Sequence, residues 1–441
     1  MFLRHLCCAA FACILFLPVN VKAADSYTME SAVLHALKKN PDLESAHFSV
    51  QAAESARKAA RSSFGPDLGA SYGYTRYSKE RSSRYEANAT TMSIKASQPL
   101  FTGFNLLNAY QKAALEEEKQ KLQLESQRLS ITAAVQEAFV SYLKAKASID
   151  STRRSLKRAK AQLDMAKTAW KIGLRPRLDV LQAETELARV EALLISYEND
   201  RDVWQTRLNT LLDFPADANV SYRGDMYIVP FHRTLEDCLD KALKQRPDLL
   251  MAKKSVEIAG KDLGMVKSQF WPKVSAILGW STTGSHLDAA GSRYTKKDYS
   301  YGEVGLTLEW TIFTSGKRAY LTQQAKRQIS SLEAAVRSSI NNSAYAVRSS
   351  LLSMQDAYRS VSVSQRGVVS ARESYQDAKM RYELQSGSYL DLLTAQSSLS
   401  DAELAEISSR ANYLISLARL YENMGELHPD LRNGKAYKPE K

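Results

Sequence analysis

Two periodicities alternate along the chain, one typical of α-helices and one typical of β-strands. Apolar residues recur at helical spacing over residues 28–63, and Pro41 within this stretch predicts a kink or break. Gly65 and Pro66 then end the helical pattern, and residues 68–75 and 92–100 alternate with a period of two. This second pattern predicts a β-hairpin with one apolar and one polar face. The apolar face consists of Leu68, Ala70, Tyr72, Tyr74, Met92, Ile94, Ala96 and Leu100.

A long uninterrupted helix follows the hairpin. Residues 103–171 contain no proline and no internal glycine, and their apolar positions keep a helical period. At ~1.5 Å per residue they form a rod of about 100 Å, which is too long for a compact domain. Gly173 and Pro176 predict a turn, after which residues 178–212 return as a second helix.

The same series of elements then occurs a second time. Residues 234–281 repeat residues 28–75 without a gap, which indicates an internal duplication. A second hairpin, a second rod over 316–384, a turn and a helix over 389–423 complete the copy. The apolar strand positions expected in this half are Val274, Ala276, Leu278, Trp280, Val304, Leu306, Leu308, Trp310 and Ile312. We therefore predict first and second repeats over 24–213 and 234–425, a linker over 214–233 that acts as a belt, and a tail over 426–441.

The lengths of these segments predict how they are arranged. In each half, two helices of about 35 residues together match one helix of about 70, so the short pair stacks end to end beside the long helix. Four strands are too few to close a barrel, which needs about eight. The apolar strand faces therefore indicate an oligomer, and three chains supply about twelve strands.

Residues 1–23 are typical of a secretory signal peptide, with Arg4 before an apolar run and Ala23 at the end of a small-residue cleavage site. Cys13 within this run is an alternative lipidation site. After cleavage Cys238 is the one remaining cysteine, and a buried apolar role is expected for it. The formal net charge is +12, but Lys and Arg are interspersed with Glu and Asp, so the pattern indicates solvated helix faces rather than nucleic-acid binding.

These motifs, in this order, resemble the TolC-type outer-membrane efflux channels over essentially the whole mature sequence. The matching motifs are Asn40-Pro41-Asp42-Leu43, Arg246-Pro247-Asp248-Leu249, Pro99-Leu100-Phe101-Thr102-Gly103, Leu178-Asp179-Val180-Leu181 and Leu390-Asp391-Leu392-Leu393. The resemblance implies a homotrimer whose 12-stranded barrel lies in the outer membrane and continues into a 12-helix periplasmic tunnel. It also implies a periplasmic adaptor and an inner-membrane pump of the resistance-nodulation-division or ABC class as partners. Pump class and cargo are left open.

The resemblance also assigns roles at the two tips where the helical hairpins turn. Asp391 matches an acid of the pore constriction, although it could instead be an N-terminal helix acid that interacts with the helix dipole. Asp179 and Tyr382 match two residues that link neighbouring helices when the entrance is closed. Gly387 stands where a linking arginine is usual and Thr394 replaces a second acid, which predicts a more weakly held entrance. Arg175 and Arg177 flank Pro176 and are adaptor-docking candidates, or else solvated turn residues.

On the strands, polar residues are expected to line the pore and aromatic residues to face lipid. The pore set is Lys95, Lys273, Glu303 and Glu309, and the lipid set is Tyr72, Tyr74, Trp280 and Trp310. Basic residues expected outside the cell are Arg81, Arg84, Arg293, Lys296 and Lys297. The sequence contains no phosphate-binding loop, dinucleotide fingerprint or metal-ligand spacing, so we expect neither an enzyme nor a cofactor.

Two other protein classes compete with a channel. A periplasmic adaptor of the same pumps also has a long helical hairpin, but it carries one such hairpin rather than two. A soluble rod-like scaffold explains the helices but leaves the two amphipathic strand pairs unexplained.

Overall fold

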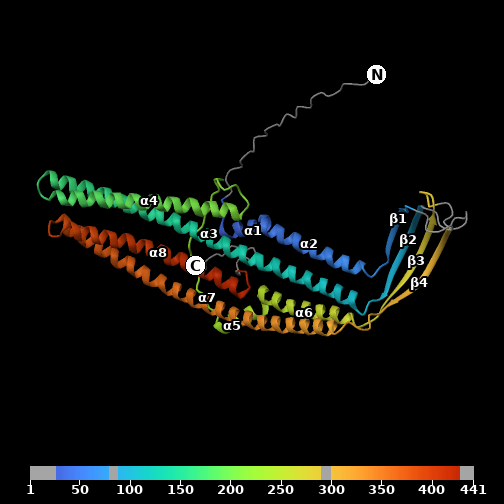
Figure 1. The fold of residues 1–441 in the computed structure, drawn as a ribbon. Helices are drawn as coiled ribbons and strands as arrows, with labels where there is room; N and C mark the ends of the chain where they lie inside the picture. The colour runs from blue at the N-terminus through green and yellow to red at the C-terminus, as the bar shows by residue number, and fades with distance from the viewer. Residues whose placement is uncertain (1–25, 79–87, 290–298, 428–441) are drawn as a thin grey trace, which may run out of the picture.

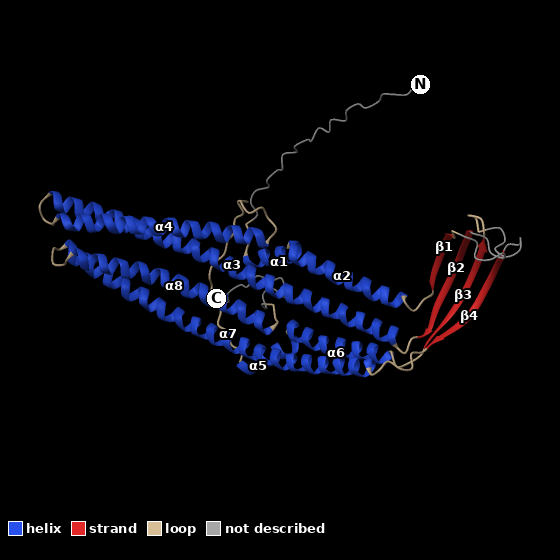
Figure 2. Cartoon of the chain, viewed as in Figure 1, coloured by secondary structure: helices blue, strands red, loops and turns tan. Residues whose placement is uncertain are grey.

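The computed structural model describes residues 26–78, 88–289 and 299–427. The predicted signal segment 1–23, the basic residues of both strand tips and most of the tail 426–441 lie outside this part. The described chain is an elongated layer of helices with a small sheet at one end (Figures 1 and 2). Its elements are α1 Met29–Lys39, α2 Pro41–Ser62, β1 Asp67–Arg76, β2 Asn88–Phe101, α3 Asn105–Lys171, α4 Arg177–Leu211, α5 Leu235–Gln245, α6 Pro247–Ser268, β3 Lys273–Gly284, β4 Tyr299–Glu309, α7 Lys317–Glu383 and α8 Tyr389–Met424.

Local chemistry sets the beginnings of the short helices. Thr28 and Ser31 form a capping box at the start of α1, and Thr234 and Asp237 form the equivalent box at the start of α5. Asn40 then ends α1 and caps α2, whose first residue is Pro41. The break predicted at Pro41 is therefore confirmed.

The long helices α3 and α7 run the length of the layer, and the shorter helices pack along them. Towards the hairpin tips the order across the layer is α4, α3, α8 and α7, whereas towards the sheet it is α2, α3, α6 and α7 (Figure 1). The predicted end-to-end placement of two short helices beside each long helix is confirmed, since α2 and α4 both pack against α3. As a result α2 and α4 form one lateral edge of the layer and α7 forms the other.

The four strands form one antiparallel sheet in the order β1, β2, β3 and β4. The two predicted hairpins are joined by the pairing of β2 with β3, in which Ile94 lies opposite Trp280. The expectation that the last strand extends to Trp310 and Ile312 is wrong, because β4 ends at Glu309 opposite Lys273, the first residue of β3. Beyond this point β3 offers β4 no further residues to pair with, and Trp310 instead donates a hydrogen bond from Nε1 to the Phe270 carbonyl over 3.2 Å.

Two apolar clusters at mid-length hold the linker against the helices. In the first, Tyr222 of the linker is buried against Phe139 and Tyr142 of α3, and its hydroxyl donates to Asn209 Oδ1 over 2.8 Å. In the second, Cys238 is fully buried beside Val347 and Leu420, and burial raises the pKa of its thiol. The expected apolar role of Cys238 is thus observed. Among the described residues, no helix has a long enough apolar stretch to span a membrane.

Candidate functional site at the hairpin tips

The end of the molecule opposite the sheet consists of two tight turns, here called the first tip (172–176) and the second tip (384–388). In the first tip Gly173 takes the left-handed conformation that ends α3 (φ 76°), and Pro176 precedes α4. In the second tip Gln385 takes the left-handed conformation instead (φ 60°). A side chain at this φ is strained, so the second tip keeps the same turn at a cost that the glycine of the first tip avoids.

Asp179 and Tyr382, predicted as a link between helices, do meet in the structure. The Tyr382 hydroxyl donates a hydrogen bond to Asp179 Oδ2 over 3.3 Å, and both side chains are buried. Tyr382 lies in an apolar cluster with Leu163, Leu392 and Tyr389 at the junction of the two helical hairpins, and Asp179 directly precedes Val180 of the same cluster. Burial and the Asp179 carboxylate raise the pKa of Tyr382, so the phenol remains neutral and able to donate.

Arg175 bridges the same two tips from the solvent side. Its Nη2 donates to the Tyr382 carbonyl over 3.3 Å and to the Gly387 carbonyl over 3.1 Å. Its guanidinium also lies 4.6 Å from the centroid of the Tyr382 ring, within cation–π range. By contrast, Arg177 is exposed and makes no side-chain hydrogen bond or ion pair with the described residues. The two arginines that look alike in the sequence therefore differ in structure.

Asp391 lies at the start of α8 and serves there as a helix-capping residue. Its Oδ2 accepts hydrogen bonds from the Ser388 hydroxyl over 2.7 Å and from the Ser388 backbone N–H over 3.3 Å. In return the Ser388 hydroxyl accepts from the Asp391 N–H over 3.1 Å. These contacts agree with the alternative interpretation of Asp391 as an acidic residue at the N-terminus of a helix. The side chain is nevertheless exposed, so the predicted pore role remains a prediction.

Behind the tips, the two hairpins meet along a buried polar seam that the sequence analysis did not identify. Ser151 of α3 donates to Glu403 of α8 over 2.8 Å, and the hydroxyls of Ser155 and Ser400 lie 2.9 Å apart. Arg158 Nη2 lies 3.5 Å from Glu403 Oε2. The only sequence signal for this seam is the absence of large apolar residues at these helical positions. Small polar contacts thus join α3 and α8, in place of the apolar packing seen inside each hairpin.

At the sheet, charge and apolar surface lie on opposite faces. Lys95 of β2 and Glu303 of β4 form an ion pair of 2.9 Å that passes over Gly279 of β3. On the other face the large apolar side chains are exposed, including Leu68, Leu278, Val304 and Leu306. The alternation predicted from the sequence is therefore confirmed.

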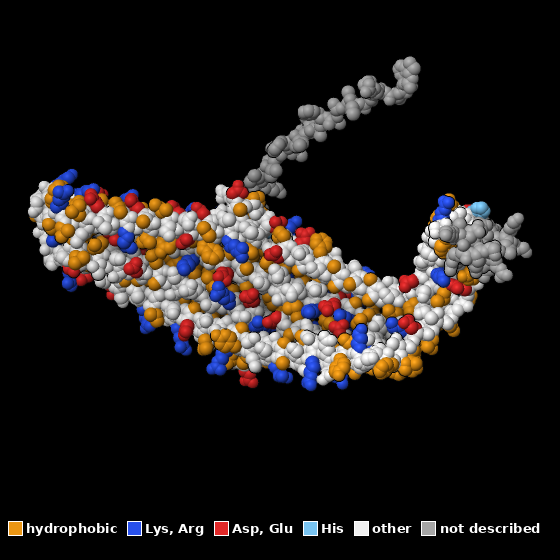
Figure 3. All heavy atoms as spheres, viewed as in Figure 1, with side chains coloured by type: hydrophobic (Ala, Val, Ile, Leu, Met, Phe, Trp, Pro, Cys, Tyr) orange, Lys and Arg blue, Asp and Glu red, His pale blue; other side chains and the backbone are white. Residues whose placement is uncertain are grey.

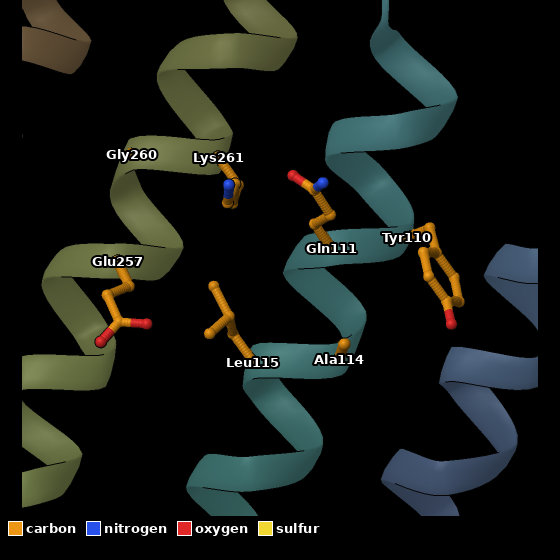
Figure 4. A pocket seen from close by; sticks show the side chains of 7 residues that line it. All are labelled: Tyr110, Gln111, Ala114, Leu115, Glu257, Gly260 and Lys261. Carbon is orange, nitrogen blue, oxygen red and sulfur yellow. The ribbon is translucent and has the colours of Figure 1, made fainter.

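Grooves between neighbouring helices carry no evident chemistry. Figure 4 shows the one between α3 and α6, in which Glu257 and Lys261 of α6 face Gln111 and Leu115 of α3 across an open gap. Gly260 leaves room at the helix surface. Within the described ranges, no group of three or more His, Cys, Asp or Glu side chains is placed to bind a metal ion.

Comparison with known proteins identifies relatives over nearly the whole chain. The family described as "Outer membrane efflux protein" matches residues 33–213 and 238–426. The chain is 25% identical to the outer membrane protein TolC of Escherichia coli over 400 residues, which cover 88% of this chain and 80% of TolC. It is 24% identical to the alkaline protease secretion protein AprF of Pseudomonas aeruginosa, over 76% of this chain and 69% of AprF. Among solved structures, CusC, for which transmembrane channel formation is described, superimposes with a TM-score of 0.79 at 18% identity over 91% of this chain and 93% of CusC.

Proposed function

Because the chain belongs to the outer membrane efflux protein family, we propose that it is the exit duct through which an inner-membrane pump and a periplasmic adaptor deliver substrate to the exterior. The family places the protein in the outer membrane and makes it an efflux protein rather than an enzyme. Cargo would cross without chemical change. The pump is of the resistance-nodulation-division or the ABC class. The similarity to AprF supports a secretion system as an alternative to an efflux system.

One observation carries this proposal: a four-stranded sheet with an exposed apolar face and two unpaired edges. Neither β1 nor β4 has a second neighbouring strand among the described residues. An apolar face is stable against lipid, but open strand edges are not, because their N–H and C=O groups need partners in a membrane. Pairing β4 of one copy with β1 of the next satisfies both edges. Three copies then close a barrel of about twelve strands, with Lys95 and Glu303 facing the water-filled interior.

The helices support the same head-to-tail arrangement. The edge strand β1 follows α2, and the edge strand β4 precedes α7, so the sheet and the helical layer share the same two lateral edges. A heterologous contact repeated around a rotation axis closes into a ring. The helical part then becomes a tunnel continuous with the barrel.

We propose that the tips form the periplasmic entrance. Asp179 and Tyr382 tie α4 to the end of α7, and three copies of exposed Asp391 would place like charges around the axis. The repulsion among these carboxylates favours opening, whereas the buried tyrosine link opposes it. Arg177, which is exposed, and Arg175 are the proposed contacts for the adaptor.

Conductance in planar lipid bilayers tests the channel directly. The purified mature protein should form an oligomer whose mobility on semi-native gels changes on heating, and it should insert as long-lived conducting units. Membrane fractionation should recover it with the outer membrane. Recovery as a soluble monomer without conductance would contradict the proposal and favour the rod-like scaffold.

Crosslinking tests the adaptor contact separately. A photo-reactive residue at position 177 should capture a co-expressed adaptor, whereas the same residue at Lys58, an exposed position on α2 far from the tips, should not. No capture at position 177 would place docking elsewhere.

A further inference from the structure

A line of unpaired basic residues follows the outer edge of α7. Its members recur every eleven or seven residues, which keeps them on one helix face: Lys326, Arg337, Arg348, Arg359 and Arg366. All five are exposed, and none has a carboxylate partner in the described part of the chain. We call this line the basic stripe. Glu333 and Asp356 lie four and three residues before Arg337 and Arg359, but within the described residues they form no ion pair with them. The basic stripe is therefore able to pair with carboxylates of another chain.

A line of acidic residues with the same kind of spacing follows the opposite edge of the layer, on α4. It consists of Glu184, Glu191 and Asp202, all exposed, and we call it the acidic stripe. Glu184 is 3.4 Å from Lys167 and Asp202 is 2.7 Å from Arg201. Glu191, in the middle of the stripe, has no ion pair within the described residues.

The two stripes emerge on the same side of the layer. Glu191 directly follows the buried Val190, and Arg348 directly follows the buried Val347. Each stripe is therefore rotated by about 100° from the packed face of its helix, in the right-handed sense when the helix is followed from its N-terminus to its C-terminus. Because α4 and α7 lie at opposite edges and run in opposite directions, the same right-handed displacement brings both stripes to the same face. Figure 3 shows basic side chains projecting along the α7 edge and acidic ones along the α4 edge.

The two stripes also match in height above the tips. Arg366 precedes the end of α7 by about 17 residues and Glu191 follows the start of α4 by about 14, which places them about 26 and 21 Å from their tips. Arg359 and Asp202 lie about 36 and 38 Å from theirs. The copies of a closed ring are related by rotation without a shift along the ring axis. A residue on the α7 edge of one copy therefore faces the residue on the α4 edge of the next copy that lies at the same height above the tips.

Exposed apolar side chains accompany both stripes on the side facing away from the chain. They are Leu352 and Val363 on α7 and Ile195 on α4. An apolar strip bordered by charges of opposite sign is the composition expected of a helix–helix contact between subunits.

We propose that the basic stripe of one copy pairs with the acidic stripe of the next, with Arg366 meeting Glu191 and Arg359 meeting Asp202. This inference rests on the proposed ring of copies and names the residues that give the ring its direction. Opposite charges attract the α7 edge of one copy to the α4 edge of the next, whereas like charges repel two α7 edges or two α4 edges. The ring therefore closes head to tail.

Charge reversal tests the pairing. In the full mature protein, Arg366→Glu alone and Glu191→Arg alone should each lower the temperature at which the oligomer dissociates on semi-native gels, by at least about 5 °C at low salt. The double variant, Arg366→Glu with Glu191→Arg, should recover most of this loss. Arg154→Glu, the same charge change at an exposed position in the middle of the layer, is the matched control. Unchanged single variants, or a double variant no better than the sum of the single losses, would overturn the pairing.

Disulfide crosslinking gives a second and direct measurement. The pair Arg366→Cys and Glu191→Cys should join copies into dimers and trimers on oxidation, whereas Arg154→Cys with Glu191→Cys should not. Conducting oligomers of the wild-type protein without this crosslink would contradict the pairing and leave the channel intact. A wild-type protein that is neither oligomeric nor conducting would instead overturn the channel itself.

Discussion

The guanidinium of Arg175 lies 4.6 Å from the ring centroid of Tyr382, although the two residues belong to different repeats. The same guanidinium binds the carbonyl of Gly387, which stands where a linking arginine is usual in the family that the sequence resembles. An arginine of the first tip, Arg175, thus contacts the second tip, where Gly387 itself carries no side chain. Planarity and several donors allow one guanidinium to satisfy two carbonyls while covering a ring, which a lysine ammonium does less well.

Arg175→Ala should loosen the tips, because it removes two charge-assisted hydrogen bonds and a cation–π contact. We expect a loss of about 1–2 kcal/mol of tip association, reduced from the buried value because the site is partly exposed to solvent. The expected result is larger or more frequent conductance steps in planar bilayers. Arg177→Ala is the matched control and should behave like the wild type, and Arg175→Lys should give an intermediate result. Equal conductance for all four proteins would argue against a role at the entrance.

Tyr382→Phe should weaken the same junction by a different route. The change keeps the ring for Arg175 but removes the hydrogen bond to buried Asp179, and an unsatisfied buried acceptor costs about 1–3 kcal/mol. Single-channel recordings should show more open time than the wild type. Tyr375→Phe, on the same helix and without a comparable link, is the control. No change in open time would rule out the tyrosine link as a determinant of opening.

The tyrosine link should be insensitive to pH in the neutral range. Its folded-state pKa is raised above the ordinary value of 10.0, first by burial and then by Asp179. The contribution of a group with a raised folded-state pKa is complete below its unfolded pKa and is lost as pH rises through the folded pKa. Open time should therefore stay constant between about pH 7 and 9 and increase only above about pH 10. A transition near neutrality would assign the pH dependence to another group.

Gly103→Ala should disrupt the joint between β2 and α3. Gly103 has φ 62°, and an added Cβ would lie 2.6 Å from the Ser268 carbonyl oxygen and 2.8 Å from Trp271 Cβ. Backbone strain and this clash should together destabilise the protein by at least about 2 kcal/mol. The fraction of heat-modifiable oligomer measures the effect. Gly73→Ala in β1, with no atom within 4 Å of the new Cβ, should be tolerated. Similar yields for both variants would show that the joint adapts.

Glu426→Gln should weaken the attachment of the segment after α8 to α5. The buried Glu426 carboxylate binds Arg233 at 2.5 Å and Lys241 at 2.9 Å. Its loss removes the ion pairs of both part-exposed cations and leaves them the longer-range attraction of Asp237. We expect a destabilisation of about 2 kcal/mol, below the 3–5 typical of a fully buried pair, because water reaches both cations. Thermal unfolding in detergent measures it. Glu333→Gln on the exposed face of α7 should leave the transition unchanged. An equal shift in both variants would point to net charge rather than to this contact.

The sequence was sufficient for local and periodic features. Pro41 and Pro247 mark the helix breaks, the long stretches without proline or glycine give α3 and α7, and the two-residue alternation gives the amphipathic strands. The sequence-based prediction was wrong where a strand ends because its partner strand ends, as β4 does before Trp310. Alternation alone continues past Glu309, but a strand needs a partner and β3 begins only at Lys273. Motif matching named Asp179 and Tyr382 together, and the structure places them within hydrogen-bond distance. The same matching treated Arg175 and Arg177 as equivalent, although only Arg175 contacts the second tip.

The sequence by itself therefore determined the elements, their duplication and the face of each strand, because periodicity and turn chemistry act over a few neighbouring residues. Only the tertiary structure decided which helices lie at the edges, which of the two arginines that flank Pro176 spans the tips, and which charges lack an ion pair within the described residues. These properties depend on contacts between residues far apart in the sequence, such as the 207 positions that separate Arg175 and Tyr382. The chain must be folded before burial and distance distinguish one exposed charge from another.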